Sequence, residues 1–151
     1  MSGLLILNIH SRVVRKYSPF STGEDKQGMK IILAIGIGSC IGGIFRYLLS
    51  QLIQNKFLST FPYGTLGVNI IGCFLIGIVF GLSERGNFTQ EWRLFLATGV
   101  LGGFTTFSAF SNETVSLLRD GQQWHAFTYI ACSVVIGLLA TFTGISFIKF
   151  L

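Results

Sequence analysis

Four long apolar stretches, separated by short polar links, form the pattern of hydrophobic and polar positions along this 151-residue chain. They cover about residues 31–52, 64–82, 92–118 and 124–150. An α-helix rises about 1.5 Å per residue and needs about 20 residues to cross a hydrocarbon core, so each stretch is long enough. Membrane strands would instead alternate over about ten residues. The pattern predicts an all-α membrane protein with four transmembrane helices over residues 29–151.

Residues 1–28 do not share this pattern. Their apolar run, Leu4–Leu7, is far too short to span a membrane, and a polar, turn-rich stretch follows it. A signal peptide would carry its charged region before a longer apolar one, so the order is wrong for that assignment. We expect an N-terminal extension that is either disordered or the result of a mis-assigned start codon.

Composition supports a membrane protein and narrows its function. Only 11% of the residues are charged and 50% are hydrophobic, whereas soluble domains carry about 25% charged residues. The net charge is +5, but no long basic run with interleaved aromatic residues occurs, so a nucleic-acid partner is not expected. Small residues four apart, such as Gly38 with Gly42 and Gly77 with Gly81, predict close helix packing, with pore lining as the alternative.

The charged residues near the span ends bear on orientation. Four spans place both termini on one side of the membrane. From residue 29 onward, leaving aside Arg46 within the first span, four Lys and Arg residues lie on the side of the termini and two on the other side. The four are Lys30, Arg85, Arg93 and Lys149, and the two are Lys56 and Arg119. This bias is small for the positive-inside rule, so the chain is expected to be able to insert in both orientations.

The third span is interrupted by the sequence LGGFTT at residues 101–106. The apolar runs before and after it, Leu94–Leu101 and Phe107–Leu118, are each too short to span alone. Unwound backbone inside a membrane must be satisfied by protein, water or an ion, and broken helices are where transporters bind ions. We predict a break with the hydroxyls of Thr105 and Thr106 facing it; a simple kink is the alternative.

A sparse set of polar and aromatic residues lies inside the spans. Arg46 is the only deep basic residue, either functional or snorkelling to the interface. The Asn69 side chain offers both a donor and an acceptor, and could either bind a ligand or form an interhelical hydrogen bond. Phe107 and Phe110 share a helix face, where their electropositive ring edges could contact an anion or their rings could face lipid.

Three further polar residues complete this set: Glu113, the only acid inside a span, and Tyr129 and Ser133, which lie four apart in the last span. A single cationic side chain with several neutral hydrogen-bond donors suits the passage of a small anion. A proton relay would instead need several titratable groups. The two histidines, His10 and His125, have no catalytic or metal-ligand partner at a recognisable spacing, so an enzyme is not expected.

Three motifs, in order and on the expected spans, resemble the Fluc (CrcB) family of bacterial fluoride channels. Residues 42–47, GGIFRY, are similar to the first-helix pattern G-G-x-x-R-[YW]. Residues 64–72, GTLGVNIIG, are similar to G-T-L-x-x-N-x-x-G. Residues 99–111, GVLGGFTTFSAFS, are similar to G-x-x-G-G-x-[ST]-T-F-S-T-F-S. The resemblance covers about residues 29–151.

The resemblance implies an antiparallel, dual-topology homodimer in the bacterial inner membrane, with two pathways for passive fluoride efflux. It also implies a structural, non-transported sodium ion held by the backbone carbonyls of Gly102 and Thr105. The implied pathway residues are Asn69 as the fluoride-coordinating amide, Phe107 and Phe110 as the phenylalanine box, Arg46 near the aqueous vestibule, and Thr106, Ser108, Glu113, Tyr129 and Ser133 along or near the route. Ala109 departs from the pattern, which usually has a hydroxyl residue there.

Two other functions stay open at this point. A small four-helix antiporter for drugs or cations would need a carboxylate near the membrane midplane, whereas Glu113 lies late in the third span. A non-transporting assembly subunit would be favoured by an unbroken third helix.

Overall fold

The computed structural model describes residues 24–57, 59–86 and 88–150. Most of the predicted extension over residues 1–28 lies outside these ranges. The chain divides into two compact units, residues 1–33 and 34–151. The described part of the first unit is the beginning of helix α2 (Glu24–Gln54).

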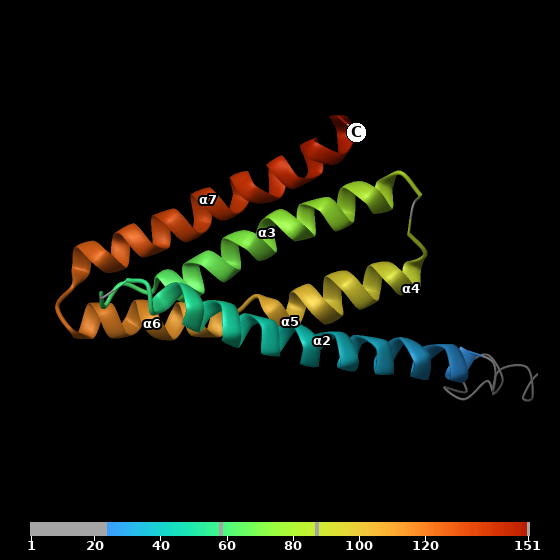
Figure 1. Ribbon diagram of the computed structural model, residues 1–151, viewed down its shortest axis with the longest axis horizontal. Helices are drawn as coiled ribbons and strands as arrows, with labels where there is room; N and C mark the ends of the chain where they lie inside the picture. Colours follow the sequence, from blue (N-terminus) through green and yellow to red (C-terminus); the bar gives the residue numbers. More distant parts are fainter. Residues whose placement is uncertain (1–23, 58, 87, 151) are drawn as a thin grey trace, which may run out of the picture. The chain divides into compact units, whose positions relative to one another are not determined.

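Helices account for nearly all of the described second unit (Figure 1). After α2, the chain forms α3 (Tyr63–Glu84), then α4 (Gln90–Arg93), the π-helical segment η1 (Leu94–Leu101), α5 (Gly102–Phe104), α6 (Phe107–Arg119) and α7 (Gln123–Phe150). Four helical stretches in the described residues are long and apolar enough to cross a membrane: Lys26–Gln54, Tyr63–Glu84, Gln90–Arg119 and Gln123–Phe150. This confirms the four predicted spans.

Local sequence explains where several helices begin and end. The Thr89 hydroxyl caps α4 by accepting a hydrogen bond from the Trp92 amide at 3.4 Å. Just after α6, Gly121 adopts a φ of +75°, a left-handed conformation that favours glycine and commonly ends helices. The chain can therefore turn tightly from α6 into α7.

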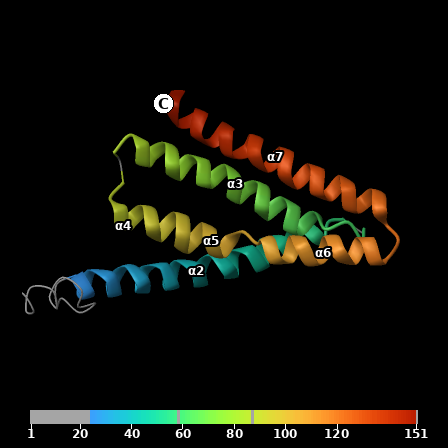
Figure 2. The same cartoon turned by 180° about the vertical axis from the view of Figure 1, so that it is seen from behind.

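Close helix packing depends on glycine. Helices α3 and α7 run side by side in the same direction (Figures 1 and 2). A Cβ added at Gly77 would lie 2.3 Å from the Thr141 carbonyl oxygen, and one at Gly144 would lie 2.3 Å from that of Phe74. Helix α2 meets the third span as closely, because a Cβ at Gly42 would lie 2.0 Å from the Val100 carbonyl oxygen. These contacts agree with the packing predicted for the small residues.

The third span is broken, as predicted, but the break is shorter than the sequence suggested. Only Thr105 and Thr106 are extended, with ψ angles of 157° and 119°. Gly102 and Gly103 stay helical within α5. The expectation that the glycines form part of the break was therefore wrong. Gly103 serves close packing instead, because a Cβ there would lie 2.4 Å from the Ser39 carbonyl oxygen.

Large apolar side chains cover much of the outer surface of the second unit. Phe142 and Leu138 on α7 are 68% and 69% exposed, and Phe45 on α2 is 60% exposed. Two small buried clusters lie inside, one around Phe61 and Tyr129 and the other around Val68 and Phe104. An apolar exterior over a small core is the arrangement expected of helices surrounded by lipid.

Candidate functional site

The break in the third span is held by one side chain from α3. Asn69 donates from Nδ2 to the Thr106 carbonyl oxygen at 3.1 Å, and its Oδ1 accepts from the Thr106 amide at 2.9 Å. The Thr106 hydroxyl then caps α6 by accepting from the Ala109 amide at 3.2 Å. Extended backbone in a membrane needs such partners. The interhelical hydrogen bond that we considered for Asn69 is therefore present.

A cavity of about 340 Å³ opens beside this break. We call it the inner cavity; its described lining carries no charged side chain. Its walls combine polar, small and apolar residues: Asn69, Gly72, Cys73, Ile76, Ala97, Leu101, Thr105, Thr106, Phe107, Phe110, Ser133 and Val134. Five of the predicted pathway residues therefore border one space: Asn69, Thr106, Phe107, Phe110 and Ser133.

Two polar groups on this wall have hydrogen-bonding capacity for a ligand. The Ser133 hydroxyl oxygen is buried and has no hydrogen-bond partner among the described residues. The Asn69 amide nitrogen carries two N–H groups, and the recorded bond to Thr106 uses one of them. A buried polar group without a partner is unusual and costs about 1–3 kcal/mol, so the site suits a small hydrogen-bond acceptor.

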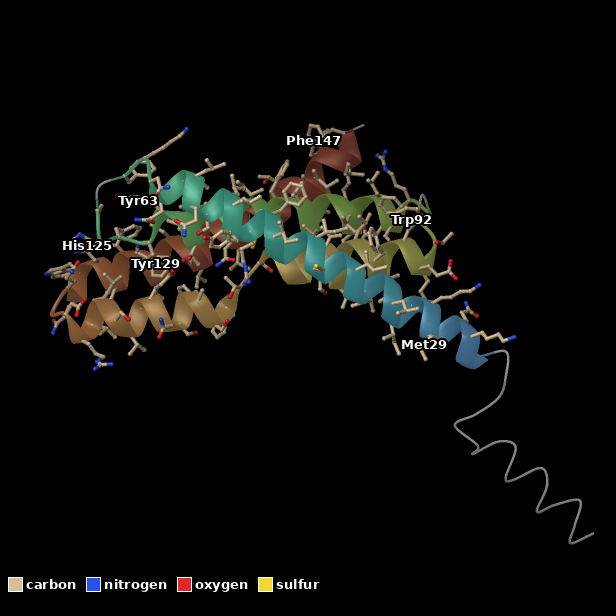
Figure 3. All side chains as sticks on the ribbon, turned by 60° about the horizontal axis from the view of Figure 1, so that its bottom comes forward. Met29, Tyr63, Trp92, His125, Tyr129 and Phe147 are labelled. Atoms are coloured by element: carbon tan, nitrogen blue, oxygen red, sulfur yellow. The ribbon has the colours of Figure 1, made fainter. Side chains whose placement is uncertain are left out.

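Aromatic rings continue from the inner cavity toward one end of the unit. The ring centroids of Phe107 and Phe110 lie 5.5 Å apart, and those of Phe110 and Tyr129 lie 5.1 Å apart. Phe61 then meets Tyr129 edge-on at 5.6 Å. Figure 3 shows Tyr129 near Tyr63 and His125 at this end, with Trp92 and Phe147 toward the other end. Phe107, by contrast, is 78% exposed.

Glu113 lies between two hydroxyl donors from neighbouring helices. Its Oε1 accepts from the Thr65 hydroxyl of α3 at 2.6 Å, and its Oε2 accepts from the Tyr129 hydroxyl of α7 at 2.7 Å. Tyr129 is fully buried and Thr65 is 7% exposed. We call these three residues the Glu113 cluster. Both carboxylate oxygens are held by the protein, and the cluster ties α3, α6 and α7 together.

A second, more polar hollow of about 470 Å³ contains Arg46. We call it the Arg46 hollow, and Ser50, Thr65, Thr106 and Ser108 also line it. Thr106 borders the inner cavity as well, so the break separates the two spaces. Ala109, the departure from the family pattern, also lines this hollow. The hollow brings Arg46 and Ser108 together, away from the lining of the inner cavity.

The two positions expected to hold sodium differ in their surroundings. Gly102 is exposed, and a Cβ there would meet only the Ala97 carbonyl oxygen at 3.7 Å, an ordinary contact. Thr105 is partly buried, and its hydroxyl donates to the Leu101 carbonyl oxygen at 2.9 Å. Among the described residues, no group of three or more His, Cys, Asp or Glu side chains could hold a metal ion.

Thr65 and Phe61 were not among the predicted site residues. A signal for Thr65 was available, because it lies four residues before Asn69 in an apolar span and therefore shares its helix face. The sequence offered no such signal for Phe61, because this residue lies in the link before α3 and contacts Tyr129 only through the tertiary fold.

Together these features define a multi-pass membrane protein, with a broken third span beside a cavity of neutral donors and aromatic rings. Residues 33–145 match the family described as CrcB-like protein, Camphor Resistance (CrcB). The chain belongs to this family, which confirms the resemblance drawn from the three motifs.

Similar proteins bear the name of an ion channel. The chain is 47% identical over 122 residues to the fluoride-specific ion channel FluC of Flavobacterium psychrophilum, an alignment of 80% of this chain and 98% of that protein. It is 46% identical to the protein of the same name from Phocaeicola vulgatus, over 78% of this chain and 97% of the other. It is 45% identical to a protein of the same name from Thermus thermophilus, in an alignment that covers 77% of this chain and 93% of that protein. These relatives confirm the prediction of a transport protein rather than an enzyme.

Proposed function

We propose that this chain is a subunit of a fluoride channel that conducts the ion passively. The names of its relatives support this function. The observation that carries it is the buried Ser133 hydroxyl, without a described partner, on the wall of the inner cavity. The hydroxyl can donate to a small anion there, and the remaining Asn69 N–H lies on the same wall.

Fluoride is small and strongly hydrated, so a channel must replace its water with donors. Hydroxyl and amide groups do this, and the electropositive edges of Phe107 and Phe110 add weak contacts. Conduction also requires that the ion leave again, and neutral donors hold it less firmly than a lysine or arginine would. None of the described residues that line the inner cavity is charged, which supports such a route.

The Arg46 hollow supplies an aqueous approach to this route. The guanidinium attracts anions toward the hydroxyls of Ser108 and Thr106, and Thr106 borders both spaces. A bacterial membrane is negative inside and drives a monovalent anion outward by about 2.3 kcal/mol per 100 mV. We therefore propose passive efflux across the bacterial inner membrane.

The observations favour a channel over the other functions considered. An antiporter carboxylate would need to exchange partners with substrate, whereas both oxygens of Glu113 accept hydrogen bonds from Thr65 and Tyr129. A non-transporting assembly subunit would be favoured by an unbroken third span, and this span is broken at Thr105–Thr106.

We further propose a structural sodium ion held by the backbone carbonyls of Gly102 and Thr105. In a continuous helix these carbonyls would accept from the amides of Thr106 and Ala109. The Thr106 amide instead donates to Asn69 Oδ1, and the Ala109 amide donates to the Thr106 hydroxyl. Two carbonyls that lose their usual donors fit a hard cation, which would supply a fixed positive charge beside the break.

This ion would be shared with a second copy in an antiparallel homodimer. The exposure of Gly102 and Phe107 leaves both accessible to another subunit. The small Lys and Arg bias supports insertion in both orientations. A reporter fused to the C-terminus of a chain lacking residues 1–28 is expected on both sides of the membrane; a single orientation would contradict this arrangement.

Ser133→Ala tests the proposed anion route directly. In liposomes loaded with potassium fluoride, the variant should slow fluoride efflux about tenfold, since a lost hydrogen bond to an anion costs about 1.5 kcal/mol or more. Ser116→Ala removes an exposed serine hydroxyl from α6 and serves as the control. Equal efflux from Ser133→Ala and the wild type would remove Ser133 from the route.

A further inference from the structure

We infer that Gln54, the last residue of α2, is a positioning residue for the anion route: its side chain caps α3 and thereby fixes Thr65 against Glu113. The inference rests on the proposed function, because it assigns Gln54 an effect on fluoride conduction. Gln54 itself lines neither the inner cavity nor the Arg46 hollow.

The Gln54 side chain uses both ends of its amide. Its Oε1 accepts from the Gly64 amide at 3.0 Å. Its Nε2 donates to the carbonyl oxygens of Ser59 at 3.1 Å and Phe61 at 3.2 Å. One side chain therefore joins the end of α2, the link that follows and the first turn of α3.

The first turn of α3 needs such a partner. The first four amides of a helix have no acceptor within the helix, and a side chain at the N-cap usually supplies one. The N-cap of α3 is Pro62, which makes no side-chain capping bond. Gln54 can take this role because α2 lies close: a Cβ at Gly64 would be 2.5 Å from the Ser50 carbonyl oxygen.

Both hydroxyl donors to Glu113 depend on the segment that Gln54 holds. Thr65 directly follows the capped Gly64 and donates to Glu113 Oε1 at 2.6 Å. Phe61, whose carbonyl Gln54 also holds, packs edge-on against Tyr129 at 5.6 Å and is 6% exposed. A looser first turn would therefore displace Thr65 and remove support from Tyr129.

Gln54→Met tests this role because it keeps the length of the side chain and removes its hydrogen bonds. The variant should slow fluoride efflux from proteoliposomes about tenfold and should raise amide hydrogen exchange in the first turn of α3. Gln90→Ala is the control, because Gln90 is an exposed glutamine at the first position of α4 and lines neither the inner cavity nor the Arg46 hollow. It should leave efflux unchanged.

A double-mutant cycle separates positioning from a general loss of structure. Thr65→Val should slow efflux, and the variant carrying both Gln54→Met and Thr65→Val should be no slower than the slower single variant, because both changes act through the Glu113 cluster. Gln54→Ala repeats the test if the methionine packs poorly.

Several results would overturn the positioning role. One is an efflux rate and an amide hydrogen exchange in Gln54→Met that equal those of the wild type. Another is a double variant in which the two reductions in efflux rate multiply. A third is failure of both Gln54 variants to give folded protein, which would assign Gln54 to folding alone. Absence of fluoride efflux from the wild-type protein would contradict the proposed channel itself and the positioning role with it. Wild-type efflux with an unaffected Gln54→Met overturns the positioning role alone.

Discussion

Asn69 binds both backbone groups of Thr106, donating to its carbonyl oxygen at 3.1 Å and accepting from its amide at 2.9 Å. One side chain on α3 thus gives the Thr106 amide the acceptor that the third span no longer provides at its break. This pairing also turns the Thr106 amide away from Gly102, whose carbonyl becomes available to another ligand.

Asn69→Ala should destabilise the protein as well as slow conduction. Removing the side chain leaves two backbone groups in a membrane without their partners, at a cost of about 1–3 kcal/mol each. The free energy of unfolding in detergent should fall accordingly. Asn112→Ala, at an exposed position on α6, is the matched control. Equal stability of the two variants would mean that the backbone at Thr106 has other partners.

Phe107→Ile and Phe110→Ile should each slow fluoride efflux about tenfold or more, because isoleucine fills similar space without an electropositive ring edge. Purified variants should still elute as the same oligomer as the wild type. Phe142→Ile, which changes a 68% exposed ring on α7, provides the control. Unchanged efflux in both Phe107→Ile and Phe110→Ile would take these rings out of the pathway.

Tyr129→Phe should slow efflux while keeping the ring contacts with Phe61 and Phe110. It removes the 2.7 Å hydrogen bond to Glu113 Oε2, and a bond to a carboxylate contributes about 1.5–3 kcal/mol. Glu113→Gln should show a comparable loss. Tyr63→Phe alters a nearby phenol outside the Glu113 cluster and should conduct normally. A normal rate for Tyr129→Phe would show that the cluster is not needed for conduction.

The sodium proposal predicts ion dependence without sodium current. Fluoride efflux should stop when sodium is removed from both sides, in buffer that also lacks lithium. Thr105→Ser should be mild, because the expected ligand is a backbone carbonyl. A Cβ at Gly102 makes only an ordinary contact among the described residues, 3.7 Å from the Ala97 carbonyl oxygen, so loss of conduction in a folded Gly102→Val subunit would locate the crowding at a second copy. Full conduction without sodium would contradict the proposed structural ion.

The sequence predicted the spans well because membrane crossing imposes a simple rule of length and hydropathy. It also predicted the break, and Asn69, Phe107 and Phe110, which were singled out from its motifs, lie together on the wall of the inner cavity. The extent of the break was harder to predict: the Gly102–Gly103 pair suggested unwound backbone, yet both residues stay helical within α5. Gly103 instead allows α2 to pack closely at Ser39, a tertiary contact with no local signal in the sequence. Contacts that join distant segments, such as Thr65 with Glu113, have no local signature beyond helix spacing.

The most direct test of the channel is the rate and selectivity of anion efflux from liposomes that contain the purified wild-type protein. Vesicles loaded with equal concentrations of potassium fluoride and potassium chloride, in sodium-containing buffer, are treated with a potassium ionophore to allow charge balance. Ion-selective electrodes then follow both anions. The account predicts rapid fluoride release with chloride retained, and slow fluoride release from Phe110→Ile. Equal release of both anions, or fluoride release no faster than from protein-free vesicles, would contradict it.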